Sequence, residues 1–264
     1  MKVACVQMDM MFENPDENFK NASILVSQAA EEGADVIVLP ETWNVGFFPR
    51  ENLAELSDDD GRRTKEVFGT LSAQLGTNIV AGSVANRRHD GVYNTSYVFN
   101  RRGECIAEYD KTHLFSPMEE DLFFRKGSHV TTFELDGNLR CGIIICYDVR
   151  FPELTRTMSI KGLDMLFIVS QWPMIRNEHL AALTKARAIE NQCFVVCCNS
   201  AGTAGETVYG GNSCVHDPWG NVISHANGRK EKIIFTDCDT SILKGIRESI
   251  NVFADRRPEL YDVN

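Results

Sequence analysis

The stretch Asp35-Val-Ile-Val-Leu-Pro40 is a continuous apolar run that follows Gly33 and ends at a proline. A strand that is apolar at every position is typical of a sheet covered on both faces, because no alternate side chain has to meet water. Apolar runs of strand length also occur at residues 142–145, 165–169 and 193–198. These runs predict strands stacked at the centre of the protein.

Helical segments alternate with the strands. Residues 15–31 carry apolar side chains close to helical spacing, and residues 62–75 form a second candidate helix. Pro152 stands at a position that the first turn of a helix tolerates, and residues 178–191 also have a helical pattern. A last helix is expected near residues 239–248, before a polar tail.

Turn signals between apolar runs predict two further groups of strands. The first group, expected to be antiparallel neighbours, comprises residues 79–84, 92–99 and 104–109. The second group, expected to form a final meander, comprises residues 213–217, 221–225 and 232–238. No linker, change of composition or repeat interrupts this pattern. The sequence therefore predicts a single α/β domain over residues 1–264, with a mixed sheet or two packed sheets inside a layer of helices.

Composition excludes several classes of protein. The chain has 264 residues, of which 43% are hydrophobic and 24% are charged, so it is globular rather than disordered. Its net charge of −10 argues against a nucleic-acid partner, because phosphate binding needs a concentrated basic surface. The apolar runs are far shorter than the roughly 20 residues that cross a bilayer. Gln7 and Asp9 interrupt the N-terminal run before it can serve as a signal peptide, so a cytoplasmic protein is expected.

Nine cysteines are present, and most of them lie in apolar, strand-like runs. No Cys-x-x-Cys pair occurs, which argues against a zinc site built from such pairs. Free, buried thiols are therefore expected, and neither a metal nor a cofactor is predicted. The nine are Cys5, Cys105, Cys141, Cys146, Cys193, Cys197, Cys198, Cys214 and Cys238.

Four polar residues follow predicted strands, where α/β folds commonly place functional groups. Cys146, on the sharp turn between a strand and a helix, suits a nucleophile, or else it is one more buried thiol. Glu41 suits a general base, because a carboxylate after a buried strand is costly to bury without a function or a partner. The alternative is a loop residue or a helix cap. Lys111 suits an oxyanion-stabilising cation, or else it is an exposed lysine. His113 is either a base paired with the cysteine or a group that orients its neighbours beside the substrate.

These residues and their surroundings resemble the nitrilase superfamily of carbon–nitrogen hydrolases, whose catalytic set is a glutamate, a lysine and a cysteine. The resemblance covers the whole chain in order. It rests on the segments Val38-Leu-Pro-Glu41-Thr-Trp, Tyr109-Asp-Lys111-Thr-His-Leu-Phe, Gly142-Ile-Ile-Ile-Cys146-Tyr-Asp-Val-Arg-Phe-Pro-Glu153, Lys185-Ala-Arg-Ala-Ile-Glu190-Asn-Gln and Asp217-Pro-Trp-Gly220. It implies a four-layer α-β-β-α sandwich and a homodimer, with a C-terminal tail of about residues 240–264 at the dimer contact.

Within the superfamily the chain is most similar to the omega-amidase branch, which hydrolyses the side-chain amide of 2-oxoglutaramate and similar short monoamides of dicarboxylic acids. This similarity rests on the short loop from Lys111 to Glu120, on Ser170-Gln-Trp-Pro173, and on the tail segment Val252-Phe-x-x-x-Arg256-x-x-Leu260-Tyr. The implied partners are a small amide substrate and water.

The resemblance also implies a mechanism through a thioester. Glu41 takes the proton of Cys146, and the thiolate attacks the amide carbon. Lys111 and the main-chain N–H of Tyr147 hold the oxyanion. Glu41 returns the proton to the departing amine and then activates the water that hydrolyses the thioester.

A second glutamate of the family corresponds to Glu120, where it would position the substrate or Lys111. Glu119 and Asp121 are alternatives, because three acidic residues in a row leave the register open by one residue. A solvated acidic loop is the remaining interpretation.

A dicarboxylic monoamide has a free carboxylate, for which an arginine is the natural partner. Arg176, in the loop after a strand, is the candidate, with a surface ion pair as the alternative. Arg150 is instead predicted to form a structural ion pair with Asp148. Trp43 and Trp172 follow strand ends and are expected either to wall the pocket or to pack as ordinary aromatic residues.

Other functions remain open from the sequence. N-carbamoyl amide hydrolysis and nitrile hydrolysis use the same three catalytic residues. A non-catalytic nitrilase-like scaffold would act through its surface, although the intact Glu41, Lys111 and Cys146 argue against it. A thiol-based redox protein would need a partner for Cys146, and Cys141, on the same strand, points elsewhere.

Overall fold

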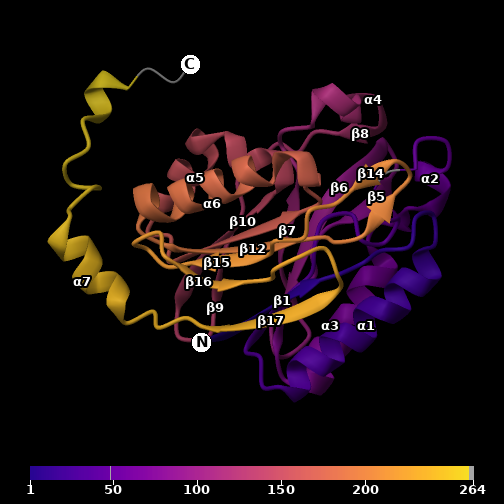
Figure 1. Cartoon of the computed structure of the whole chain (residues 1–264), viewed down its shortest axis with the longest axis horizontal. Helices are drawn as coiled ribbons and strands as arrows, with labels where there is room; N and C mark the ends of the chain where they lie inside the picture. Colours follow the sequence, from indigo (N-terminus) through magenta and orange to yellow (C-terminus); the bar gives the residue numbers. More distant parts are fainter. Residues whose placement is uncertain (48, 262–264) are drawn as a thin grey trace.

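Two β-sheets packed face to face form the centre of the protein, and helices cover the outer face of each sheet (Figure 1). The computed structural model describes residues 1–47 and 49–261. This arrangement confirms the predicted α-β-β-α sandwich.

Two pairs of helices form the outer layers. Helices α1 (Pro15–Glu31) and α3 (Arg62–Leu75) lie against the first sheet. Helices α5 (Pro152–Ser159) and α6 (Asn177–Asn191) lie against the second. All four were expected from the sequence, and the first two have the bounds that it predicts.

The first sheet has nine strands, in the order β17-β1-β2-β4-β6-β5-β3, with β7 and β8 also paired to β6. Its strands are β1 (Lys2–Gln7), β2 (Val36–Val38), β3 (Asp58–Asp59), β4 (Asn78–Val80), β5 (Val84–Arg88), β6 (Gly91–Phe99), β7 (Cys105–Asp110), β8 (Phe124–Arg125) and β17 (Lys232–Asp237).

The second sheet has six strands, in the order β16-β15-β12-β11-β10-β9. Its strands are β9 (Thr132–Leu135), β10 (Leu139–Ile145), β11 (Met165–Ser170), β12 (Phe194–Asn199), β15 (Cys214–His216) and β16 (Val222–His225). Strands β10, β11 and β12 run parallel to one another, so their carboxyl ends meet at one edge.

Short elements complete the described chain. They are α2 (Leu53–Leu56), α4 (Glu120–Phe123), α7 (Ile242–Ser249), the hairpin of β13 (Thr203–Ala204) and β14 (Thr207–Val208), and the 3-10 turns η1 (Ser116–Met118), η2 (Cys146–Arg150), η3 (Met174–Arg176) and η4 (Pro258–Leu260). Among the residues that the structure describes, no helix is both long and apolar enough to cross a membrane.

Alternation along the central strands explains why their sequences are apolar throughout. On β2, Val36 and Val38 belong to the core between the two sheets, whereas Ile37 belongs to the core beneath α1 and α3. On β10, Ile143 faces the inter-sheet core and Ile144 faces α5 and α6. Each such side chain contributes about 1.5–3 kcal/mol by leaving water. Both faces of both sheets are thus stabilised by burial.

Two predicted strands are shorter in the structure. The run 35–40 forms strand only over Val36–Val38, because Pro40 has no N–H to donate and the chain turns there. The run 79–84 is split into β4 and β5 by Gly82, whose φ of +61° breaks the extended conformation. Both pieces still pair antiparallel with β6, as does β7, so the predicted neighbours are confirmed.

The predicted final meander is wrong in its last strand. Strands β15 and β16 pair with each other in the second sheet. Strand β17 instead crosses to the first sheet and pairs antiparallel with β1. The reason is packing: there Ile234 faces Cys5 in register and enters the core between the sheets.

All nine cysteines are free, and seven of them are buried, as the sequence predicts. Cys105 is exposed, and Cys146 is partly exposed.

Gly82→Ala is expected to lower the free energy of unfolding more than Gly76→Ala does. Both glycines have a φ of +61°, so alanine carries the same left-handed penalty of about 1–2 kcal/mol at each site. A Cβ at Gly82 would lie 2.0 Å from the carbonyl oxygen of Pro40, whereas nothing lies within 4 Å of one at Gly76. This overlap adds a further ~1–3 kcal/mol, measurable by urea unfolding. Equal losses in the two variants would contradict the prediction.

Candidate active site

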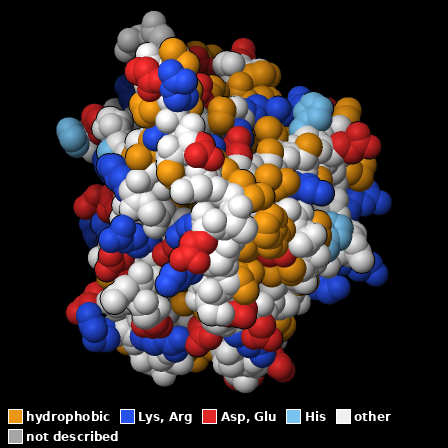
Figure 2. Space-filling model, turned by 90° about the vertical axis from the view of Figure 1, so that its left-hand side faces the viewer, with side chains coloured by type: hydrophobic (Ala, Val, Ile, Leu, Met, Phe, Trp, Pro, Cys, Tyr) orange, Lys and Arg blue, Asp and Glu red, His pale blue; other side chains and the backbone are white. Residues whose placement is uncertain are grey.

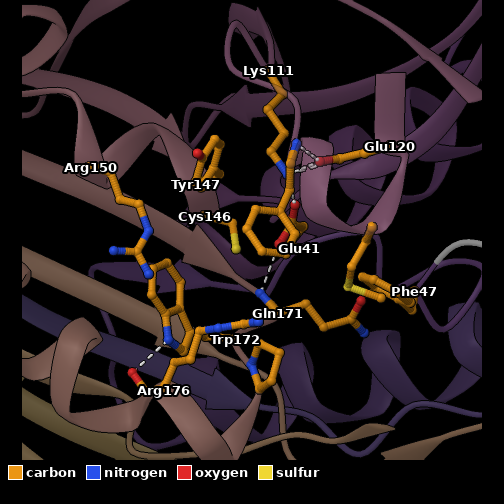
Figure 3. Close-up of a pocket in the computed structure, with 13 residues that line it drawn as sticks. Glu41, Phe47, Lys111, Glu120, Cys146, Tyr147, Arg150, Gln171, Trp172 and Arg176 are labelled. Atoms are coloured by element: carbon orange, nitrogen blue, oxygen red, sulfur yellow. Dashed lines mark hydrogen bonds and ion pairs between the residues drawn. The ribbon is translucent and has the colours of Figure 1, made fainter. Parts of the chain in front are cut away.

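Polar side chains from both sheets meet at the ends of their strands (Figure 3). Glu41 follows β2 and Lys111 follows β7, both in the first sheet. Cys146 follows β10 and Gln171 follows β11, both in the second sheet. The main-chain N–H of Glu41 donates to the carbonyl oxygen of Ser170 over 3.4 Å. The candidate site is therefore built across the junction of the two sheets.

The ammonium group of Lys111 lies between two carboxylates. Its Nζ is 2.8 Å from Oε1 of Glu41 and 2.8 and 2.9 Å from the two carboxylate oxygens of Glu120. All three side chains are buried. Burial by itself lowers the pKa of Lys111, but the charges of Glu120 and Glu41 outweigh it and raise that pKa well above its ordinary value. The lysine therefore stays charged.

Glu120 is the acidic residue of its loop that reaches Lys111. Burial raises the pKa of Glu120, and the charge of Lys111 opposes this shift. Glu119 instead pairs with Arg50 at 2.8 Å near the surface, and Asp121 is exposed. Of the three residues that the sequence left open, only Glu120 contacts Lys111.

Three donors hold the carboxylate of Glu41. Its Oε1 accepts hydrogen bonds from Nζ of Lys111 and, at 2.9 Å, from Nδ2 of Asn94. Its Oε2 accepts one from the main-chain N–H of Gln171 at 2.8 Å. The next residue, Thr42, has a φ of 41°, which side chains other than glycine rarely adopt. The turn that aims Glu41 is therefore locally strained.

Cys146 lies directly after β10 on the turn η2, with a φ of 46°. A nucleophile on such a sharp, strained turn projects out of the sheet. Burial raises the pKa of Cys146 well above its ordinary value; the charge of Glu41 adds to this shift and that of Lys111 opposes it. The thiol therefore keeps its proton at neutral pH unless a base removes it. Glu41 lies beside it in the pocket (Figure 3).

A fully buried aspartate fixes the turn that carries the cysteine. Oδ2 of Asp148 accepts hydrogen bonds from the main-chain N–H of Ile145 at 3.0 Å and from the hydroxyl of Tyr109 at 2.7 Å. Its Oδ1 accepts one from the main-chain N–H of His113 at 2.9 Å. Asp148 thus ties the turn after β10 to the loop after β7, which carries the lysine.

The polar groups open into a pocket of about 460 Å³. Its lining is mostly apolar and aromatic; it consists of Glu41, Phe47, Lys111, Phe115, Met118, Glu120, Cys146, Tyr147, Arg150, Gln171, Trp172, Pro173 and Arg176. Within residues 1–47 and 49–261, no cluster of three or more His, Cys, Asp or Glu side chains has the arrangement of a metal site.

Two arginines border the pocket. The guanidinium carbon of Arg150 lies 4.8 Å from the ring of Trp172, and that of Arg176 lies 5.2 Å from the ring of Phe115. Neither arginine forms an ion pair with a carboxylate in the part of the chain that the structure describes. Both positive charges are therefore available to a ligand.

The predicted ion pair between Asp148 and Arg150 is wrong. The aspartate oxygens are taken by the donors described above and by Oγ1 of Thr112 at 3.1 Å. Arg150 turns away and stacks on Trp172 beside the pocket.

Trp43 does not wall the pocket. It is fully buried beneath α1 and α3, and its ring packs edge-on against Phe19 and Phe68, with centroids 4.7 and 5.4 Å apart. The strained turn after β2 directs Glu41 toward the pocket and Trp43 into the core, so here the alternative of an ordinary core aromatic is the correct one.

His113, which the sequence placed beside the substrate, is not among the residues that line the pocket. Its Nδ1 is 2.8 Å from Oδ1 of Asp148, and its ring stacks on Phe151 with centroids 3.6 Å apart. It orients its neighbours, which is the other role that the sequence suggested.

Trp172, Tyr147 and Arg176 do line the pocket. Nε1–H of Trp172 donates to the carbonyl oxygen of Arg176 at 2.8 Å, which fixes the turn η3 against the wall. The side chain of Tyr147 is drawn among the lining residues in Figure 3, whereas the sequence singled out the main-chain N–H of this residue.

Three residues that hold the site were missed by sequence reasoning. Asn94 lies inside a strand rather than at its end, and Gln171 acts through its main chain, so neither had a signal. Asp148 had one, because it lies two residues after Cys146 in the same motif, but it was assigned to the wrong partner.

Comparisons with known proteins show the family to which the chain belongs. A family model described as carbon–nitrogen hydrolase matches residues 2–248. A 2-oxoglutaramate amidase of Bacillus subtilis is 43% identical over 259 residues, which cover 98% of each chain. An omega-amidase of Danio rerio is 31% identical, over 100% of this chain and 97% of its own. A CN-hydrolase superfamily protein of Xanthomonas campestris, solved with an arsenic adduct in its active site, has a TM-score of 0.91 at 28% identity, over 100% of this chain and 99% of its own.

Proposed function

Because the chain belongs to the carbon–nitrogen hydrolase family, we propose that it is a cysteine-dependent amidase. Its substrates are short monoamides of dicarboxylic acids, of the 2-oxoglutaramate or succinamate type, and its products are the acid and ammonia. The observation that carries this proposal is a buried Glu41–Lys111–Glu120 cluster beside Cys146. The same pocket has two arginines that pair with no carboxylate of the described residues. The similarity to a 2-oxoglutaramate amidase supports the choice of substrate.

The first half of the reaction forms a thioester. Glu41 takes the proton from Cys146, and the sulfur uses the freed electron pair to bond to the amide carbon. The carbonyl oxygen becomes an oxyanion, which the ammonium of Lys111 and the main-chain N–H of Tyr147 stabilise. When the C–N bond breaks, Glu41 gives its proton to the departing nitrogen, and ammonia leaves.

The second half of the reaction hydrolyses the thioester. Glu41, again a carboxylate, takes a proton from water, and the hydroxide adds to the thioester carbon. The same two donors hold the second oxyanion. Collapse breaks the C–S bond, releases the acid and returns the proton to Cys146. The chain's own side chains supply every proton transfer, so the proposal needs no cofactor.

The role of Glu120 is to hold Lys111 in its charged form. An ammonium between two carboxylates keeps its proton, as the raised pKa of Lys111 indicates. It can then stabilise an oxyanion without acting as an acid. Glu120 also fixes the direction of the lysine, because both of its oxygens contact Nζ.

The two arginines are the proposed partners of the substrate's free carboxylate. Arg176 was expected from the sequence, and the structure adds Arg150. The aromatic rings beneath them restrain both guanidinium groups without neutralising them. Cys146 and both arginines line the same pocket, so the proposed linear substrate would place its amide at the cysteine and its carboxylate at these charges.

Wild type is expected to release ammonia from 2-oxoglutaramate and succinamate, and Cys146→Ala is expected to release none. Glutamine, an N-carbamoyl amine and a simple nitrile complete the panel, because related hydrolases use the same triad for other C–N bonds. Cys105→Ala is the matched control, since that thiol is exposed and lies outside the pocket.

Turnover of the carbamoyl compound or the nitrile alone would contradict the proposed substrate. It would still be consistent with the proposed roles of the three catalytic residues. If no compound were turned over in a cysteine-dependent way, a non-catalytic scaffold would be favoured.

Arg150→Gln and Arg176→Gln are each expected to raise KM for 2-oxoglutaramate by about 10- to 100-fold. A hydrogen bond to a charged group contributes roughly 1.5–3 kcal/mol, and the neutral amide loses the charge. Butyramide, which has no carboxylate, is the control substrate, and its KM should stay within a factor of about two of wild type. A KM that rises equally for both substrates would show that the arginines only shape the pocket.

We further propose that residues 1–264 act as a single domain and form a homodimer through the tail of about residues 240–264, of which 262–264 lie outside the described residues. Leu243 and Ile246 of α7 are buried against the protein, whereas Ile250 is 50% exposed and Leu260 is 67% exposed. The tail lies along the left-hand side of the molecule in Figure 1, and Figure 2, which views that side, shows hydrophobic side chains gathered on it. A second copy would cover these apolar surfaces.

Truncation after Asn251 is expected to shift the protein from dimer to monomer in sedimentation velocity. This cut keeps α7, whose contacts stabilise the fold. Lys20→Ala, an exposed change on α1 and outside the tail, is the control and should leave the profile unchanged. A truncated protein that sediments as a dimer would rule out a role for the tail.

A further inference from the structure

Asn94 contacts both the proposed base and the loop of the lysine. It lies on β6 and is fully buried. Its main-chain carbonyl oxygen accepts a hydrogen bond from the main-chain N–H of Lys111 at 2.9 Å. Its side-chain Nδ2 donates a hydrogen bond to Oε1 of Glu41 at 2.9 Å. One residue therefore sets the position of the lysine's main chain relative to the carboxylate of Glu41.

The acceptor sites of the Glu41 carboxylate are filled unequally. Each carboxylate oxygen has about two lone-pair sites. Those of Oε1 are taken by Nζ of Lys111 and Nδ2 of Asn94. Among the described residues, the one N–H group that donates to Oε2 is that of the Gln171 main chain. The open acceptor site of this carboxylate is therefore on Oε2.

We propose that Asn94 is a positioning residue. Its amide occupies the second acceptor site on Oε1 of Glu41 and thereby directs the proton of Cys146 to Oε2. This inference rests on the proposed function, in which Glu41 carries that proton from the thiol to the departing amine. In the step, the S–H bond breaks, an O–H bond forms on Oε2, and the electron pair stays on sulfur to form the S–C bond. When the proton is delivered to the departing nitrogen, this O–H bond breaks and an N–H bond forms.

The orientation of the Asn94 amide supports this role. A flipped amide would place its oxygen against Oε1 of Glu41, and two acceptors would repel each other. In the orientation observed, Oδ1 of Asn94 has no hydrogen-bond partner among the described residues. A buried polar atom in this state costs stability. The side chain is thus arranged around its contact with Glu41.

The contact also sets the strength of the base. A hydrogen bond donated to a carboxylate favours its charged form, so each donor makes the carboxylate a weaker base. Without the amide of Asn94, Glu41 would lose one of its hydrogen-bond donors, and Oε1 would gain an open acceptor site.

Asn86 provides a matched control. It is a fully buried asparagine on the neighbouring strand β5, and its Oδ1 also lacks a partner among the described residues. Its Nδ2 donates to Oγ1 of Thr95 at 3.2 Å and to the hydroxyl of Tyr97 at 2.9 Å. It has no contact with Glu41, so its replacement reports the loss of a buried amide alone.

The test compares the pH dependence of kcat/KM in wild type, Asn94→Asp, Asn94→Ala and Asn86→Ala. Asn94→Asp keeps the shape and removes the donor, and Asn94→Ala removes the donor without adding an acid. In both, the midpoint of the acidic limb is expected to rise by about one to two pH units, because a hydrogen bond to a charged group has that magnitude. Asn86→Ala should keep the wild-type midpoint even if its unfolding temperature falls.

A second readout does not depend on the substrate. The rate of alkylation of Cys146 by iodoacetamide, followed by peptide mass spectrometry against pH, reports the cysteine–glutamate pair directly. The same upward shift is expected in both Asn94 variants. If no amide is hydrolysed but the alkylation midpoint moves, the proposed substrate fails and the role of Asn94 stands. Wild-type midpoints in folded Asn94 variants, or an equal shift in Asn86→Ala, would overturn the inference.

Discussion

A lysine ammonium buried between two glutamates is the interaction on which the site depends. An isolated charge at this depth would cost several kcal/mol, and removing one member of a buried pair typically costs about 3–5 kcal/mol because the other is left uncompensated. Glu41, Lys111 and Glu120 are therefore tolerated only together. The cluster lies beside a thiol whose own burial already favours the neutral form. The cluster thus keeps the nucleophile protonated at rest and keeps the base and the cation in place.

The cluster in turn depends on how the two sheets pack. Glu41 and Lys111 come from the first sheet, and Cys146 and Gln171 come from the second. The apolar core between the sheets therefore sets the distances between the groups that we propose to react. Asp148 adds a polar link at the same junction, because its carboxylate joins the turn of one sheet to the loop of the other. Substitutions in that core are therefore expected to change the distances between these groups.

The parts that could be predicted from the sequence are those with a local signal. Helix spacing, apolar runs and residues at strand ends led to the sandwich and to Glu41, Lys111 and Cys146. The parts that could not be predicted depend on contacts between distant segments. Trp43 follows a strand as Glu41 does, and only the strained turn between them decides which enters the pocket. The sequence of strand β17 has the pattern of a meander, but the strand pairs with the open edge of β1 in the other sheet.

The hydrogen bond from Gln171 to Glu41 has a consequence for how such a pocket can diverge. The donor is a main-chain N–H, so no substitution at this position other than proline deletes it. The side chain of the same residue lines the pocket. Selection can therefore alter ligand preference here while the base keeps its support. At this one position, the main chain supports the proposed base and the side chain can vary with the ligand. Such a division is expected of a fold that serves many related hydrolases.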